Sequence, residues 1–236
     1  AGQKVIIKRT GAKKYLAYFQ SYTNTFDSID HLKRLYDRAL STGEYVELII
    51  STRPDCLNGQ IIDLLSSYKK RVSAVWVELG LQSGNDASLT YLNRGHSVNS
   101  FKDAVMRVKE KGIEVSTHVI LGIPEEHDEH ILNTAAVIRE VKSEAVKIHN
   151  LHVVAGTSLY ESYKRGEIEV PQMADHLHNT ILFLTHIEKE VVIQRLVSDT
   201  PKHRLAAPRD FPDKGYFLLS LEKLMIQQDV FQGEYV

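Results

Sequence analysis

The sequence is poor in cysteine and almost without net charge. Its 236 residues include one cysteine, Cys56, which excludes an internal disulfide and any metal site built from several thiolates of this chain. With 29 Lys and Arg against 30 Asp and Glu, the net charge of −1 disfavours a polybasic nucleic-acid binder, although a local basic patch remains compatible with it. No apolar run approaches the roughly 20 residues that cross a bilayer, and the N-terminus lacks a signal-peptide core. We therefore expect a cytoplasmic protein without a membrane partner.

Short apolar runs alternate with amphipathic stretches along most of the chain. The runs begin roughly 30 to 40 residues apart, which is the length of a strand–helix unit, and they comprise residues 15–19, 45–50, 74–81, 113–121 and 145–154. Apolar residues at three- and four-residue spacing predict helices over 29–40, 61–68, 101–108 and 131–141. This alternation predicts an α/β fold with a parallel sheet, and the lack of a GxGxxG turn favours a complete or partial barrel over a Rossmann sheet.

The pattern changes in the last third of the chain. Helices are expected over 173–189 and 217–228, a strand over 191–196, and a polar, proline-bearing connection over 198–215. We therefore predict two parts: a barrel core over residues 1–160, and a C-terminal helical and strand extension over 161–236 that packs on it.

Polar residues follow each predicted strand, although apolar residues lead into it. In α/β barrels these strand ends carry the chemistry, so that five polar ends together predict a lined pocket. The ends are rich in amide, guanidinium and carboxylate groups, which suit a zwitterionic ligand with hydroxyl groups. They comprise residues 20–25, 51–56, 78–84, 117–126 and 147–157.

Six segments, five at these ends and one between the third and fourth, resemble successive motifs of radical S-adenosylmethionine (SAM) enzymes. The likeness runs from about residue 12 to about residue 166, and more weakly to the end, through YFQSYTNT, STRPDCL, VELGLQS, NRGH, THVILGIP and KIHNLHVVAGTSL. The chain is most similar to the YhcC-like family, which is related to the elongator catalytic subunit and to coproporphyrinogen dehydrogenase. The resemblance implies a partial (β/α)6-type TIM-like barrel, with SAM and a [4Fe-4S] cluster as cofactors.

The resemblance also implies which residues contact SAM. Arg94 matches an arginine that clamps the SAM carboxylate, a role that suits a bidentate donor. Gln82 matches a glutamine that contacts the ribose or the methionine part. Gly122 matches a turn where a missing side chain lets the backbone approach adenine. The full implied set is Gln20, Ser21, Thr23, Ser51, Glu78, Gln82, Arg94, His118, Gly122 and Gly156.

Several of these positions need comment. Gln20, Ser21 and Thr23 replace a GGE-like segment that holds the SAM amino group. Ser51 and His118 depart from the family pattern, because relatives carry Glu and Asp there to contact the ribose.

The cluster ligands are the main departure from the family. Radical SAM enzymes hold their cluster with three cysteines in a CxxxCxxC-type loop after the first strand, and thiolates suit iron–sulfur ligation. This chain has only Cys56, and residues 1–11 resemble the end of the helix that follows that loop. We therefore expect a truncated barrel, without its first strand and cluster loop, that binds SAM but neither holds the cluster nor cleaves SAM. Its expected partners are a reductant protein and a substrate, either tRNA at the wobble uridine or a small molecule.

Two other functions remain open from the residues alone. Lys147 is placed where a Schiff-base lyase or aldolase would have its lysine. A non-catalytic SAM- or nucleotide-binding module is the other alternative. Lys147 and His149 are candidate substrate contacts, because alternate strand residues share a face. His149 and His152 lie three residues apart on a predicted strand, which argues against a shared metal site.

Overall fold

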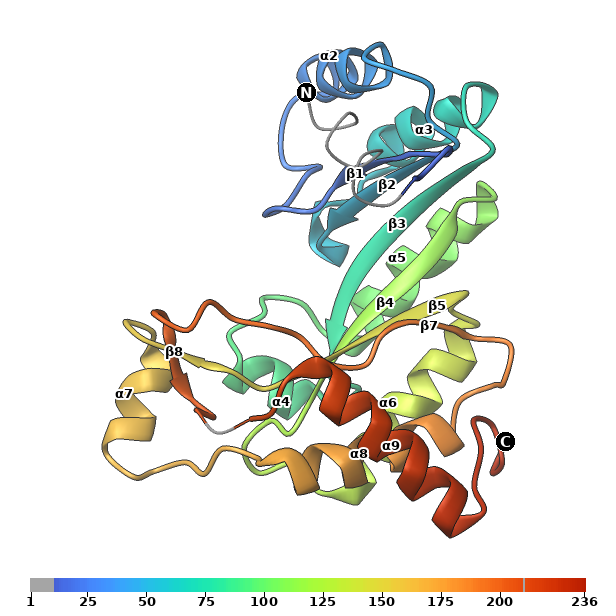
Figure 1. Ribbon diagram of the computed structural model, residues 1–236. Coiled ribbons are helices and arrows are strands. Elements are labelled where there is room, and N and C mark those ends of the chain that lie inside the picture. Colours follow the sequence, from blue (N-terminus) through green and yellow to red (C-terminus); the bar gives the residue numbers. More distant parts are fainter. Residues whose placement is uncertain (1–10, 210) are drawn as a thin grey trace. The chain divides into compact units, whose positions relative to one another are not determined.

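Six strands form one sheet in which neighbours in the chain are neighbours in space. The computed structural model describes residues 11–209 and 211–236. The sheet order is β1 (Leu16–Phe19), β2 (Glu47–Thr52), β3 (Ala74–Gln82), β4 (Glu114–Leu121), β5 (Ala145–Asn150) and β7 (Val192–Arg195) (Figure 1). The pairs β1–β2, β2–β3 and β5–β7 are parallel. Sequential parallel strands joined by helices are the arrangement of a (β/α) barrel, so the predicted fold class of a partial barrel is confirmed.

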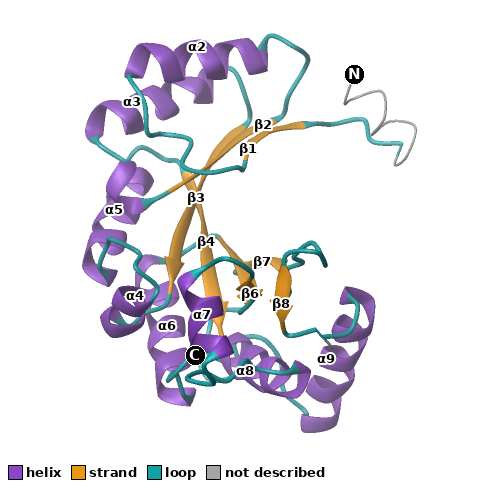
Figure 2. Cartoon of the chain, turned by 90° about the vertical axis from the view of Figure 1, so that its left-hand side faces the viewer, coloured by secondary structure: helices purple, strands orange, loops and turns teal. Residues whose placement is uncertain are grey.

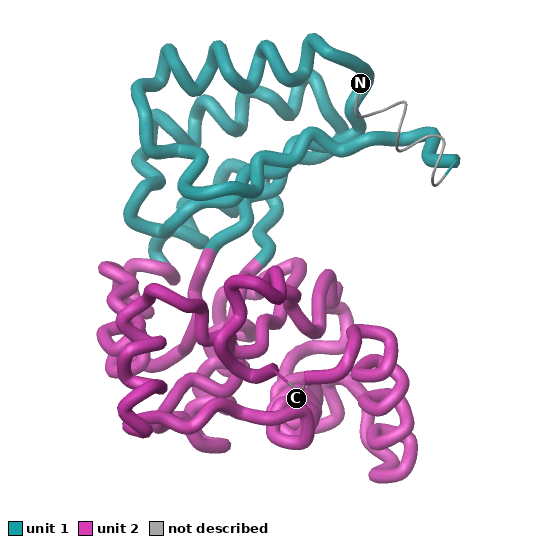
Figure 3. Tube along the Cα trace, turned by 60° about the vertical axis from the view of Figure 1, so that its left-hand side comes forward, with its two compact units in different colours: residues 1–79, 103–116 teal, residues 80–102, 117–236 magenta. Residues whose placement is uncertain are grey.

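The chain divides into two compact units, which Figure 3 colours separately. The first comprises residues 1–79 with 103–116, and the second comprises 80–102 with 117–236. Strands β3 and β4 and helix α5 (Val98–Glu110) each pass from one unit into the other along the chain. The predicted boundary at residue 160 between a core and an extension stays a prediction.

In the first unit, helices α2 (Ile29–Leu40) and α3 (Gly59–Ser67) lie on one side of the strands (Figure 2). The strand face that they cover is apolar, and Ile50 and Val77, which are register partners, are fully buried on it. The Phe19 ring meets the Tyr36 ring of α2 edge-on, with 5.1 Å between ring centroids. Short 3-10 turns, Pro54–Cys56 and Tyr68–Lys70, flank α3. The opposite strand face is thus left for the polar side chains described below.

The second unit contains the remaining helices and a small separate sheet. The helices are α4 (Asp86–Tyr91), α6 (Asp128–Val141), α7 (Ser158–Lys164), α8 (Met173–Thr185) and α9 (Lys214–Gln228). Strands β6 (Val153–Val154) and β8 (Leu205–Ala207) pair antiparallel, and a small apolar cluster lies between them and α7. Helix α8 ends at Thr185, so the helix predicted over 173–189 is shorter than expected. The connection predicted over 198–215 contains strand β8.

The predicted strand over 145–154 was wrong in its length, because the chain leaves the main sheet after Asn150. The Asn150 side chain accepts hydrogen bonds from the backbone and side chain of Ser198, both at 3.0 Å, and its Nδ2 donates to His152 Nε2 at 2.8 Å. These bonds replace strand pairing, so His152 does not lie on β5. The argument that His149 and His152 occupy opposite faces of one strand therefore fails.

The third predicted helix also begins earlier than expected. Its capping residues are Ser97 and Ser100, whose hydroxyls accept from each other's backbone N–H at 2.9 and 3.1 Å. The helix accordingly begins at Val98, three residues before the predicted start at residue 101.

A packing contact of Gly84 generates a stability prediction. A Cβ at Gly84 would lie 2.7 Å from Thr134 Cα and 2.8 Å from Asn133 O, both backbone atoms of α6. We expect Gly84→Ala to lower the free energy of unfolding by about 1–3 kcal/mol, measured by urea denaturation, because backbone must move to admit the methyl group.

The matched control is Gly59→Ala in the first turn of α3, where a Cβ would meet no atom within 4 Å. Alanine is the better helix former, so this variant should be as stable as the parent or more stable by up to about 1 kcal/mol. Equal stability of the two variants would contradict the packing argument.

Candidate functional site

The loop after β1 is tied to the end of β2. Asn24 Nδ2 donates to the carbonyl oxygens of Phe19 and Ser51 at 2.9 and 3.0 Å. Thr25 Oγ1 donates to the carbonyl oxygen of Cys56 at 2.7 Å. These bonds fix a loop that contains three of the implied SAM contacts, Gln20, Ser21 and Thr23, of which the first two are exposed.

Ser51 and Glu78 are brought together in the first unit. They are register partners on β2 and β3, and Ser51 Oγ donates to Glu78 Oε2 at 2.6 Å. The Tyr18 hydroxyl donates to the same oxygen at 2.6 Å, and Glu78 is buried. A serine at position 51 thus holds the neighbouring carboxylate in place, whereas the glutamate of the relatives would set a second negative charge beside it.

Gln82 and Arg94 are brought together in the second unit, in space that Gly80 leaves open. A Cβ at Gly80 would collide with Gln82 Nε2 and would lie 3.0 Å from an Arg94 guanidinium nitrogen. Gln82 is buried and has φ of 71°, in the left-handed region that non-glycine residues seldom adopt. Backbone strain of this kind, about 1–3 kcal/mol, is concentrated at binding and catalytic sites. Gly80 was not predicted from the sequence as a site residue; its only signal there is a glycine inside a strand.

The segment after β3 is fixed against α6 by side chains that the sequence did not single out. Ser83 Oγ donates to Glu126 Oε1 at 2.5 Å, and the Gly84 amide donates to Thr134 Oγ1 at 2.8 Å. Asn85 Nδ2 donates to the carbonyl oxygen of His130 at 3.0 Å. Together these bonds hold the chain directly beyond Gln82.

The backbone conformation by itself favours glycine at the two positions assigned to SAM, Gly122 and Gly156. Gly122 has φ of 87°, and a Cβ there would lie 2.6 Å from Pro171 Cγ. Gly156 has φ of 83° and lies in an exposed turn, where a Cβ would meet no atom within 4 Å. Their contact with SAM stays a prediction.

His118 and His149 form a pair of imidazoles on β4 and β5. Their ring centroids are 5.3 Å apart, and His149 Nε2 is buried without a hydrogen-bond partner among the described residues. Burial, followed by the nearby His118 and Arg195, lowers the pKa of His149 to about 3, so this ring is neutral at physiological pH. Lys147, two residues earlier on β5, is buried. The predicted association of Lys147 and His149 with substrate stays a prediction.

Comparison with known proteins identifies the family. A family model described as the radical SAM superfamily matches residues 4–162, and one described as the radical SAM C-terminal domain matches residues 143–226. This chain belongs to the radical SAM superfamily. Protein YhcC of Escherichia coli K12 is 31% identical over 219 residues, which cover 93% of this chain and 71% of that protein. The predicted resemblance to radical SAM enzymes of the YhcC-like family is thereby confirmed.

Two further proteins are similar over different shares of the chain. A tRNA uridine(34) acetyltransferase of Methanocaldococcus infernus is 34% identical over 161 residues, which cover 66% of this chain and 29% of that protein. The structure of an N-terminally deleted Elp3 from the same organism superimposes with a TM-score of 0.85 at 23% identity. It covers 98% of this chain, which spans 58% of that chain, and it shows the same fold.

The superfamily implies SAM and a [4Fe-4S] cluster, and the residues present fit the first of these only. In the second unit, the buried Gln82 amide and the Arg94 guanidinium are hydrogen-bond donors of the kind that suits a carboxylate group such as that of SAM. A cluster requires several thiolates, whereas this chain has Cys56 alone, and burial raises the pKa of that thiol. Among the described residues, no helix is long and apolar enough to span a membrane.

The neutral state of His149 predicts a pH dependence of stability. Its pKa in the folded chain lies below the ordinary value near 6.5, so the unfolded chain binds a proton that the folded chain does not. The stabilisation is complete above about pH 6.5 and is lost as the pH falls toward 3, by up to about 1.4 kcal/mol per pH unit. We expect His149→Gln to show a shallower loss of stability than the parent between pH 6.5 and 4.5, in urea denaturation.

The control is His203→Gln, which removes an exposed imidazole. It should keep the pH profile of the parent. Parallel profiles for the parent and His149→Gln would contradict the prediction.

Proposed function

We propose that this chain binds SAM, and that Arg94 and Gln82 hold the methionine part of the ligand. The observation that carries the proposal is the shared space over Gly80, where a guanidinium and a buried amide lie together. A guanidinium can donate two parallel hydrogen bonds to the SAM carboxylate. The strained backbone of Gln82 supports the proposal, because residues with such backbone conformations are concentrated at ligand-binding and active sites.

We assign a second contact to Glu78. Its carboxylate is held in one orientation by Tyr18 and Ser51, each at 2.6 Å. An oriented carboxylate accepts hydrogen bonds from an ammonium or from ribose hydroxyls, and SAM carries both. The resemblance to the family adds Gln20, Ser21, Thr23, His118, Gly122 and Gly156 to the residues that we propose for SAM.

In this superfamily SAM supplies a 5′-deoxyadenosyl radical when an electron from the cluster cleaves it. We propose that these 236 residues bind and orient SAM without cleaving it, because one thiol does not hold a cluster. The cluster ligands and a reductant protein would have to come from outside these residues. The alternative, a non-catalytic SAM-binding module, would have the same SAM site but would not associate with a cluster or a reductant protein.

For the substrate we propose tRNA, at the wobble uridine. The support is the 34% identity with a tRNA uridine(34) acetyltransferase, and action on tRNA would place the protein in the cytoplasm. Membership in the radical SAM superfamily argues against the Schiff-base alternative at Lys147, because the chemistry of that superfamily starts from SAM and does not require a lysine imine.

The SAM site is tested by titration calorimetry of the chain with SAM. Arg94→Ala and Gln82→Ala should each raise the dissociation constant about tenfold or more, since each removes hydrogen bonds to a charged ligand. Arg34→Ala, which removes an exposed arginine of α2, serves as the matched control and should bind like the parent. Unchanged binding in both site variants would overturn the assignment.

The same preparation separates binding from cleavage. After anaerobic treatment with iron and sulfide, the chain with SAM and dithionite should release no 5′-deoxyadenosine above a protein-free control. Reductant-dependent release would show that these residues hold a working cluster.

The substrate is tested in the host of this protein. Deletion of the gene should remove one modification of wobble uridine from digested tRNA, detected by mass spectrometry, and the intact gene should restore it. A complemented strain carrying Arg94→Ala should resemble the deletion. An unchanged nucleoside profile after deletion would exclude tRNA as the substrate while leaving the SAM site untouched.

A further inference from the structure

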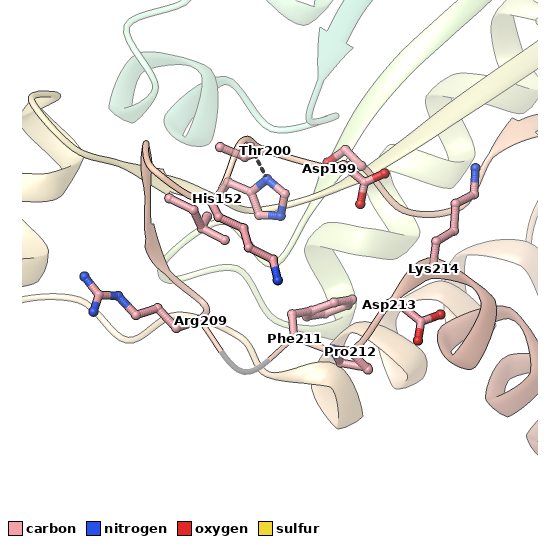
Figure 4. A pocket seen from close by; sticks show the side chains of 11 residues that line it. His152, Asp199, Thr200, Arg209, Phe211, Pro212, Asp213 and Lys214 are labelled. Atoms are coloured by element: carbon pink, nitrogen blue, oxygen red, sulfur yellow. Dashed lines mark hydrogen bonds between the residues drawn. The ribbon is translucent and has the colours of Figure 1, made fainter.

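The second unit contains a cavity that shares no lining residue with the set assigned to SAM. It is formed by His152, two residues after the end of β5, and by residues between 198 and 214 (Figure 4). Its volume of about 730 Å³ lies within the range of small-molecule sites, about 300–1,000 Å³. None of the family assignments above falls on a residue that lines it.

One wall of the cavity is fixed by a chain of hydrogen bonds. His152 Nε2 accepts from Asn150, so its proton lies on Nδ1, which is 2.6 Å from Thr200 Oγ1 and donates to it. Burial lowers the pKa of His152, partly offset by the nearby Asp199, so the ring is neutral. The wall thus presents an oriented, uncharged imidazole.

A second wall of the cavity is the ring of Phe211, which packs against two other rings. Phe211 lies 5.9 Å from the rings of both Phe217 and His176, and these two rings lie 5.0 Å from each other. His176 is itself anchored, because its Nε2 donates to the carbonyl oxygen of Leu196 at 3.0 Å. Phe211 is half-buried, so part of its ring remains available to a planar ligand.

Three exposed cations border the cavity: Lys202, Arg209 and Lys214. Figure 4 shows Arg209 and Lys214 on opposite sides, with Phe211 between them. Among the described residues, none of the three forms an ion pair within 4.0 Å. Of the two carboxylates in the lining, Asp213 caps helix α9 by accepting from the Tyr216 amide at 3.0 Å.

We propose that this cavity binds a nucleoside monophosphate, either free or as one nucleotide of an RNA. The base would stack on Phe211, since stacking on aromatic side chains accepts any base. The phosphate would meet the exposed side chains of Lys202, Arg209 and Lys214, and arginine and lysine are the usual phosphate donors. This inference goes beyond the proposed SAM site and does not depend on it, because the two share no residue.

The test is equilibrium binding of uridine 5′-monophosphate, uridine and inorganic phosphate to the whole chain. The monophosphate should bind more tightly than either fragment. Lys202→Ala and Arg209→Ala should each raise the dissociation constant of the monophosphate about tenfold, because a charge-assisted hydrogen bond is lost. Both variants should leave the dissociation constant of uridine unchanged. Lys189→Ala, an exposed lysine outside the lining, is the matched control.

Phe211 requires a variant that keeps its packing. Phe211→Leu retains an apolar side chain against Phe217 and His176, and circular dichroism verifies the fold. This variant should bind both uridine and the monophosphate more weakly, because base stacking on the ring is lost. Equal binding of the monophosphate by the parent, Arg209→Ala and Phe211→Leu would overturn the proposal, as would no binding by the parent.

Two further comparisons identify the source and the place of binding. A short oligoribonucleotide that binds more tightly than the monophosphate, through the same side chains, supports RNA as the source, whereas equal affinity supports a free nucleotide. Loss of monophosphate binding in Gln82→Ala with full binding in Arg209→Ala would place the nucleotide at the SAM residues and overturn the proposal. Failure of SAM to bind, with monophosphate binding intact, would overturn only the proposed function.

Discussion

Gln82 and Arg94 both place side-chain nitrogens over Gly80, in space that a side chain at position 80 would enter. The requirement is steric, since any Cβ at Gly80 would collide with the Gln82 amide and press on the Arg94 guanidinium. Strand β3 therefore carries the hydrogen-bonded carboxylate of Glu78, the glycine at position 80, and Gln82, whose backbone is in the left-handed region. The binding chemistry that we propose for this chain depends on that gap more than on any other single feature.

The loops that bear polar side chains are held by amide side chains at the strand ends. Asn24 ties the loop after β1 to β2, Asn85 ties the segment after β3 to α6, and Asn150 ties the end of β5 to Ser198. Asn24 donates to two carbonyl oxygens, whereas Asn85 and Asn150 each donate and accept, because an amide side chain has both a donor and an acceptor group. Rigid loops of this kind position a ligand with little loss of conformational entropy on binding.

The cofactors of the superfamily make separate demands on the protein. For SAM we propose hydrogen-bonding side chains, among them the Gln82 amide and the Arg94 guanidinium, which are buried and half-buried. The cluster needs soft thiolate ligands, and the single cysteine has a raised pKa. Binding of SAM and its reductive cleavage are therefore distinct properties, and the first can be studied in this chain without the second.

The sequence by itself determined the alternation of strands and helices, the polar strand ends and the motifs at Gln82 and Arg94. These are local properties, because the periodicity of apolar residues and the order of short motifs can be read along the chain. Only the tertiary structure decided why Gly80 and Gly122 lack side chains, since the atoms that exclude a Cβ at Gly122 belong to Pro171. It also decided that β5 ends at Asn150 and that Phe211 lines a cavity with His152. Those outcomes rest on contacts between residues about fifty positions apart, such as Asn150 with Ser198, which no local pattern encodes.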